Sequence, residues 1–233
     1  LFFPAKDYDG IFRIGVATSA SPIGPFIPQL KAIKGSFSID PAVFKDDDES
    51  YYMYFGGLWG GQLQRWREGF FNNDEPESPT AFIPKDHEPA LLPVMAKMTD
   101  DLLEFAETPK EVQIIDENGI LLLAGDNNRR FFEAAWMHKH DNRYYFSYST
   151  GDTHFICYAV GDNPYGPFSY KGKVLNPVVG WTSHHSICTI KDKDYLFYHD
   201  SSLSKGVTHL RSVKVTEIKY RDDGTIITVN PYG

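Results

Sequence analysis

The sequence predicts an all-β fold of the propeller type, in which short four-stranded sheets repeat around a central axis. Two repeated patterns indicate this class. A hairpin made of an apolar strand, a polar turn and an aromatic strand occurs three times, and a short apolar strand followed by a Pro-x-Gly-Pro-Phe turn occurs twice. Aromatic residues also make up 15% of the 233 residues, which favours strands and surfaces that stack on flat ligands.

The hairpin repeat defines two neighbouring strands of each blade. Each turn is polar and contains Asp, and the strand after the turn is rich in Tyr and Phe. The copies lie at residues 41–55, 134–148 and 186–199. The second repeat, at 14–26 and 156–168, supplies further strands downstream, so that a blade has about four.

Counted in this way, the chain holds about three and a half blades. An incomplete first blade covers 1–33, and three fuller blades start near residues 36, 131 and 182. An unclosed ring exposes strand edges, so we expect a further blade and a half to precede Leu1 in the native protein, or a second chain to supply it.

We expect the whole chain to be a single domain, because all-β folds often reach this length undivided. The blade from 36 to 125 carries an insertion at about 67–98 that is rich in Pro, Asp and Glu. This insertion is expected to form a loop over the open face of the propeller or a short lid. A helix of more than a turn or two is expected nowhere except at 98–105.

The composition excludes several classes of partner. The formal net charge is −8 and no stripe of Lys and Arg is present, which argues against nucleic acid or an anionic membrane. The apolar runs are too short to span a bilayer. Cys157 and Cys188 lie in strand-like runs without a CxxC partner, and both are expected to be buried free thiols. Cellular location and oligomeric state stay open.

Three polar residues stand at the start of the opening strand of successive blades. They are Asp40, Glu133 and His184. The opening strand lies nearest the axis, so these side chains are expected to converge at the mouth of the channel. Two carboxylates and a histidine suit general acid–base work on a glycosidic bond. Glu133, set between aromatic residues and alanines, is costly to bury without a functional role.

These segments resemble glycoside hydrolase family 43, a family of five-bladed β-propeller enzymes. Residues 39–44 with the turn 46–48 are similar to the family segment that carries its second catalytic aspartate. Residues 132–136 are similar to the segment of its general acid. The later histidine segment and the closing blade of the family are matched by residues 182–187 with 198–199, and by 209–213 before 220–226.

The resemblance implies an inverting hydrolase with three catalytic carboxyl groups. Glu133 would be the general acid, and Asp40 would orient it and raise its pKa, since a nearby like charge disfavours the ionised form. The base of the family lies on the first strand of the first blade, before the segment that resembles residues 1–5. No residue of this chain matches it, and Asp7 and Asp9 are best explained as solvated turn residues.

The resemblance also implies roles for a histidine and an arginine near the substrate. His184 would bind substrate, or would hold a water or a calcium-centred water cluster. It is preferred over His185 because strand alternation puts the two side chains on opposite faces. Arg211 would donate to sugar hydroxyls or steady Glu133. No cofactor is required, and a structural calcium is left open.

Two tryptophans offer flat surfaces for a sugar ring. Trp59 lies in the glycine-rich segment 56–61 directly after a blade strand, and Trp181 precedes the histidine segment. Each either stacks on a sugar face or packs between blades. We include Trp59 among the expected substrate-binding residues.

The favoured function is hydrolysis, with inversion, of terminal xylosyl or arabinofuranosyl units of plant cell-wall oligosaccharides such as xylan and arabinoxylan fragments. This describes a β-xylosidase, an α-L-arabinofuranosidase or both, provided that the missing N-terminal blade supplies the base. The alternative is a non-catalytic carbohydrate-binding propeller, or an inactive fragment without its base. Patterns typical of zinc proteases, serine hydrolases and nucleotide-binding enzymes do not occur.

Overall fold

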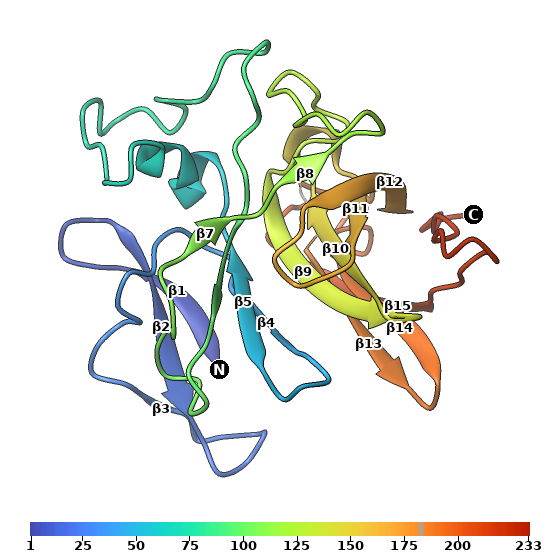
Figure 1. Cartoon of the computed structure of the whole chain (residues 1–233), viewed down its shortest axis with the longest axis horizontal. Coiled ribbons are helices and arrows are strands. Elements are labelled where there is room, and N and C mark those ends of the chain that lie inside the picture. Colours follow the sequence, from blue (N-terminus) through green and yellow to red (C-terminus); the bar gives the residue numbers. More distant parts are fainter. Residues whose placement is uncertain (182–183) are drawn as a thin grey trace. The chain divides into compact units, whose positions relative to one another are not determined.

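The computed structural model describes residues 1–181 and 184–233, which consist almost entirely of β-strands and loops (Figure 1). Within these residues, helical structure is limited to the short 3-10 turns η1 (Trp59–Gly61), η2 (Leu63–Trp66) and η3 (Gly151–Thr153). No helix in the described ranges has the length and apolar character needed to cross a membrane. The strands form four separate sheets in chain order, as the repeated hairpins predict.

The chain forms two compact units. The first comprises residues 1–83 and 93–111, and the second comprises 84–92 and 112–233.

Two antiparallel sheets make up the first unit. One has the order β1-β2-β3 and the other the order β4-β5-β6-β7. Within each sheet, strands that are consecutive in the chain pair with each other, which is the pattern of a meander of hairpins. The strands are β1 (Phe2–Lys6), β2 (Phe12–Thr18), β3 (Ile27–Pro28), β4 (Ala42–Lys45), β5 (Tyr51–Phe55), β6 (Val94–Lys97) and β7 (Lys110–Glu111).

The long connection in this unit joins β5 to β6 and spans residues 56–93. It contains η1 and η2, while residues 94–97, at the end of the expected insertion, form β6. The helix expected at 98–105 is wrong, because Met98 and Phe105 pair as an antiparallel bridge. Between them the Asp101 carboxylate accepts hydrogen bonds from the Thr99 hydroxyl and the Leu103 amide, which closes a turn instead of a helix.

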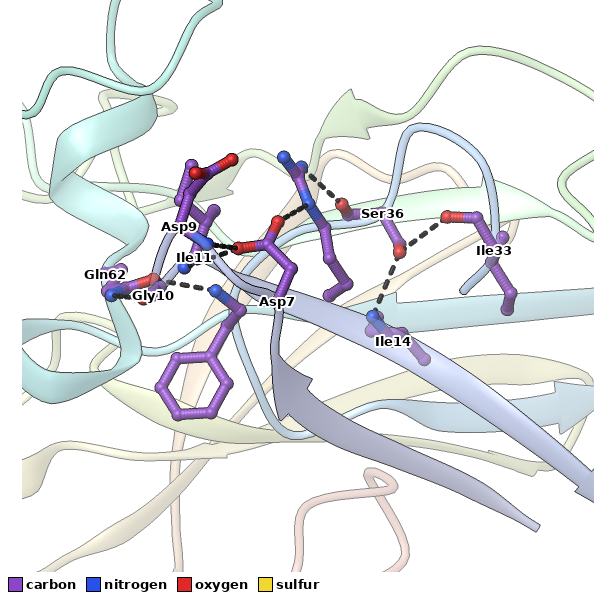
Figure 2. A network of polar contacts seen from close by, with 10 residues as sticks. Asp7, Asp9, Gly10, Ile11, Ile14, Ile33, Ser36 and Gln62 are labelled. Carbon is purple, nitrogen blue, oxygen red and sulfur yellow. Dashed lines mark hydrogen bonds and ion pairs between the residues drawn. The ribbon is translucent and has the colours of Figure 1, made fainter. Parts of the chain in front are cut away.

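A buried serine stabilises the first sheet (Figure 2). The Ser36 hydroxyl accepts a hydrogen bond from the Ile14 amide at 3.0 Å and donates to the Ile33 carbonyl at 2.7 Å. Arg13 donates from Nη1 to the Ser36 carbonyl and from Nε to the Asp7 carboxylate, at 3.2 and 3.1 Å. The loop 29–36 is therefore attached to β2 by side-chain hydrogen bonds where strand pairing ends.

The second unit also contains two sheets. Their orders are β8-β12-β11-β10-β9 and β13-β14-β15. Strand β8 pairs in parallel with β12, so residues assigned from sequence to the blade 36–125 complete the following sheet. The blade start expected near 182 falls outside the described residues. The strands are β8 (Ile114–Ile115), β9 (Glu133–His140), β10 (Arg143–Ser149), β11 (Ile156–Gly161), β12 (Phe168–Leu175), β13 (His185–Ile190), β14 (Lys193–Asp200) and β15 (Ser212–Glu217).

The hydrophobic core of the second unit is built from the aromatic strands that the repeats predict. Two phenol groups inside this core form hydrogen bonds to the backbone. Tyr145 donates to the Gly224 carbonyl at 2.8 Å, and the Tyr158 hydroxyl accepts from the Ile226 amide at 2.9 Å. The buried members are Tyr145, Ile156, Tyr158, Val160, Val174, Leu175, Val178, Ile187, Leu196, Tyr198, Ile218 and Ile226.

The two cysteines differ in burial. Cys157 on β11 is buried, as expected, and burial raises the pKa of its thiol to about 12. Cys188 on β13 is exposed, so that part of the expectation is wrong. The neighbouring Ile187 is buried, because successive side chains of a strand point to opposite faces and Cys188 points away from the core.

A histidine is buried at the edge of this core. His138 on β9 is 7% exposed, and its Nε2 lies 2.9 Å from the Tyr220 hydroxyl. The Tyr220 ring in turn stacks on His140 with centroids 3.5 Å apart. Loss of hydration lowers the pKa of His138 to about 4, although the nearby charge of Asp194 acts in the opposite direction.

We therefore expect stability to fall in acid because of His138. The pKa of an unfolded histidine is 6.5, so the contribution is fully present above pH 6.5 and is lost as the pH falls towards 4. Urea unfolding of the parent should show a loss up to about 3 kcal/mol larger than that of His138→Gln between pH 7 and 4. The buried His185 is present in both proteins and cancels. Identical pH dependence of the two would contradict the assignment.

Candidate active site

Asp40 lies in the turn that leads into β4. The residue is half-buried and has a φ of 58°, in the left-handed region that aspartate tolerates better than most residues. The Gly56 amide at the end of β5 donates to the Ile39 carbonyl at 2.8 Å. This bond lies beyond the last residue pair of β4 and β5 and fixes the backbone next to Asp40.

The loop that carries Trp59 packs directly on the Asp40 turn. Ser38 is fully buried, and its hydroxyl donates to the Gly61 carbonyl at 2.6 Å while accepting from the Gly57 amide at 3.0 Å. A Cβ on Gly61 would lie 2.9 Å from the Ile39 side chain, so a larger residue would force that side chain to shift. One hydroxyl thus connects both ends of the loop to the turn.

A second attachment holds this loop from the other side. The Gln62 side chain accepts from the Phe12 amide and donates to the Gly10 carbonyl, both at 2.9 Å, so it bridges to the β1–β2 hairpin (Figure 2). Trp59 itself is half-buried. The first unit therefore places Asp40 and Trp59 on adjoining, well-anchored turns. Neither Ser38 nor Gln62 was identified from sequence, because their partners are distant in the chain.

Glu133 is the first residue of β9, at the strand start where the repeat predicted it. It pairs with Ser149 on β10, and the register shifts directly after this pair. The shift is a β-bulge at Ala134, which is fully buried and has a φ of 60°. Bulges are common beside active sites, where they change the direction of a side chain. A left-handed alanine is strained by about 1 kcal/mol, which marks this position as one that the fold enforces.

The loop after β10 contacts the residue that precedes Glu133. Phe132 is buried, and its amide donates to the Ser149 carbonyl at 2.9 Å. Gly151 has a φ of 72°, and a Cβ there would collide with the Phe132 ring. The glycine thus allows the loop to pack tightly over the start of β9.

His184 and Arg211 meet through a third residue, His199. The His184 amide donates to His199 Nε2 at 3.1 Å, and Arg211 Nη1 donates to the same nitrogen at 3.3 Å. Two donors on Nε2 require a neutral imidazole. Burial, and then the charge of Arg211, lower the pKa of His199 to about 4. His199 belongs to the segment 198–199 that resembles the family, but no role is predicted for it from sequence.

The neighbouring histidines have different environments, as strand alternation predicts. His184 is exposed, whereas His185 is 4% exposed with its Nε2 at 2.6 Å from the Ser147 hydroxyl. Desolvation lowers the pKa of His185 well below its usual value, so this residue is a neutral core histidine.

The first unit contains Asp40 and Trp59, and the second contains Glu133, His184 and Arg211. Convergence of the two carboxylates therefore stays a prediction. Asp7 caps its own turn by accepting from the Asp9 and Ile11 amides, which favours the structural interpretation of that aspartate.

The described residues do not form a recognisable metal-binding site. No group of three or more His, Cys, Asp or Glu side chains in residues 1–181 and 184–233 is arranged to hold a metal ion. Calcium takes six to eight oxygen ligands, and His184 offers one nitrogen. A calcium contact through water at His184 stays a prediction, and no chemical step is assigned to it.

Comparison with known proteins identifies the family. Residues 1–226 match the model of glycosyl hydrolases family 43. A xylosidase/arabinosidase of Bacteroides ovatus is 58% identical over 229 residues, which cover 98% of this chain and 69% of that protein. A β-xylosidase of Xylanibacter ruminicola is 54% identical over 229 residues, with 98% and 70% covered.

Solved structures agree with this result. A GH43 β-xylosidase/α-arabinofuranosidase from a compost microbial metagenome, in complex with xylotriose and calcium-free, has a TM-score of 0.95 and 63% identity and covers 99% of this chain and 69% of that chain. A GH43_1 enzyme from Xanthomonas citri complexed with xylotriose has a TM-score of 0.93 and 52% identity, with 100% and 68% covered. The predicted all-β propeller class is confirmed.

Because Gly151 packs directly on the Phe132 ring, we expect substitution of Gly151 to destabilise the fold. Gly151→Ala should lower the free energy of unfolding by about 2–4 kcal/mol, because it adds a collision to the cost of a left-handed alanine. Gly119→Ala is the matched control, since Gly119 has a φ of 78° but no atom within 4 Å of a Cβ. It should lose only about 1 kcal/mol. Equal losses in urea unfolding would show that the Phe132 contact is unimportant.

Proposed function

Because the chain belongs to family 43 of the glycosyl hydrolases, we propose that it hydrolyses terminal glycosidic bonds of xylan-derived oligosaccharides, releasing xylosyl or arabinofuranosyl units. The observation that carries this proposal is Glu133, a half-buried carboxylate directed by a β-bulge at the start of a blade strand. The names of the relatives support the same substrate class, since they include xylosidase/arabinosidase and β-xylosidase. Bound xylose and xylotriose in related structures agree with it.

In the proposed reaction Glu133 donates its proton to the oxygen of the departing sugar. A second carboxylate takes a proton from water, which attacks the anomeric carbon from the opposite face and inverts its configuration. In inverting enzymes the two groups stand about 6.5–9.5 Å apart, which leaves room for that water. We assign the base to none of residues 1–233. The matched region makes up 69% of the Bacteroides ovatus relative and 70% of the Xylanibacter ruminicola relative.

Asp40 acts on the acid and not on the substrate in this proposal. Its negative charge disfavours ionisation of Glu133, so the acid keeps its proton closer to neutral pH. The anchored turn that holds Asp40 supports such a role, since a tuning charge must stay at a fixed distance to be effective.

Arg211 and His184 bind the sugar in the proposed site. Arg211 is exposed and keeps further N–H groups beyond those that donate to His199 and to the Thr208 carbonyl. These groups suit sugar hydroxyls or the Glu133 carboxylate. His184 offers its exposed imidazole to a substrate hydroxyl or to an ordered water, which a structural calcium would share. Trp59 supplies an aromatic face.

A non-catalytic sugar-binding propeller is the second candidate. The observation that favours it is that no residue of this chain is assigned as the base. Binding of xylo-oligosaccharide without turnover by the protein that contains this chain would establish the alternative and overturn the proposed hydrolase.

Removal of the acid gives the first functional test. Glu133→Gln should lower kcat on xylobiose by about 10²–10⁴-fold, the usual contribution of a general acid, and should spare 2,4-dinitrophenyl xyloside, whose leaving group departs without protonation. Glu111→Gln, at an exposed carboxylate on β7, is the matched control and should match the parent. Parallel losses on both substrates would argue that Glu133 is structural.

Removal of the tuning charge gives the second test. Asp40→Asn should lower the pKa of Glu133, so the alkaline limb of the kcat profile should move about one unit towards acid. Asp48→Asn changes an exposed turn carboxylate near the same hairpin and should leave the profile in place. An unshifted limb in Asp40→Asn would remove Asp40 from the mechanism.

A further inference from the structure

An exposed tryptophan in the second unit directly follows a backbone segment that is held by hydrogen bonds. Trp181 is 38% exposed. Its ring meets the His154 ring edge to face, with centroids 5.2 Å apart and planes at 83°. The two residues belong to different loops, one after β12 and one after β10, so the contact joins these loops.

The backbone before Trp181 is fixed by two hydrogen bonds and by close packing at Gly180. The Ser201 amide donates to the Val179 carbonyl, and the Val179 amide donates to the Tyr232 hydroxyl, both at 2.8 Å. Gly180 has a φ of 109°, and a Cβ there would lie 2.7 Å from the Ser201 hydroxyl. A loop held in this way loses little entropy when a ligand binds to its side chain.

The His154 side of the pair is also constrained. His154 has a φ of 60°, and its amide donates to the Gly151 carbonyl at 2.8 Å. Its Nδ1 is buried and has no hydrogen-bond partner within the described residues, and its ring packs against the Trp181 ring. A left-handed histidine is strained, and such strain collects at functional sites.

Both loops emerge at the end of the sheet where Glu133 lies. Ser149, the last residue of β10, pairs with Glu133, and the loop with His154 follows directly. Leu175, the last residue of β12, pairs with Ile156 at the start of β11, so the loop with Trp181 leaves the same end. The placement lies wholly within the second unit and does not depend on the first.

We propose that Trp181, backed by His154, forms an aromatic platform that stacks on the sugar ring on the leaving-group side of the bond that Glu133 protonates. The proposal rests on the proposed function. A general acid must reach the leaving oxygen, which belongs to the departing sugar, so an aromatic group beside the acid is placed within reach of that sugar. The apolar C–H face of a xylosyl ring suits an indole, and no charge is needed for a neutral sugar.

The platform predicts a loss that depends on the leaving group. Trp181→Ala should lower kcat/KM for xylobiose about tenfold, which corresponds to roughly 1.4 kcal/mol of stacking. It should change kcat/KM for β-xylosyl fluoride less than twofold, because that leaving group is a single atom. Trp181→Phe keeps a flat ring and should recover most of the loss. In Glu133→Gln, xylobiose should shift the tryptophan emission, and Trp181→Phe should remove that shift.

Each other outcome has a defined meaning. Equal losses on xylobiose and the fluoride, or no loss on either, would overturn the leaving-group platform. If the protein that contains this chain hydrolyses neither compound, the proposed function fails and the leaving-group assignment fails with it, and binding then tests the stacking contact separately. Weaker binding of xylotriose to Trp181→Ala than to the unsubstituted protein would support a stacking contact with sugar, and unchanged binding would overturn that contact as well.

Discussion

Strand β10 pairs with β9 on one side and with β11 on the other, and its residues 144–149 are buried. Because both edges are hydrogen-bonded and both faces are packed, this strand has little freedom to shift. Glu133 is positioned by its pairing with Ser149, the last residue of β10. The buried residues Tyr145 and Tyr148 lie on the same strand. A shift of register by one residue would move every one of these side chains to the opposite face.

Burial of neutral histidines follows from the same packing. His138 and His185 are enclosed by the sheets, where a charged imidazole would lose its hydration without a compensating partner. His199 shows the same effect at the candidate site, with the positive charge of Arg211 added to burial. Its neutral ring accepts hydrogen bonds from His184 and Arg211. Burial therefore keeps histidines neutral both in the core and at the candidate site, where the neutral ring positions the two residues proposed to bind sugar.

In the first unit, long loops carry two of the predicted site residues outside the sheets. Hydrogen bonds from small polar side chains hold these loops in place where no strand pairing is available. Ser36 attaches a loop to β2, Ser38 attaches the glycine-rich loop to the Asp40 turn, and Gln62 attaches it to the first hairpin. Each group is buried or half-buried, where an unsatisfied backbone amide or carbonyl would be costly.

The sequence by itself determined the hairpins, the all-β class and the position of Glu133 at a strand start, because alternation and turn chemistry act over a few neighbouring residues. The family was predicted from the resemblance of short motifs in this chain to those of glycoside hydrolase family 43. Tertiary structure alone decided the bulge at Ala134, the exposure of Cys188 and the contact of Trp181 with His154. It also replaced the helix expected at 98–105 with a bridged turn. These features depend on strand register and on contacts between distant segments, and a local pattern carries no information about which distant partner the folded chain brings near.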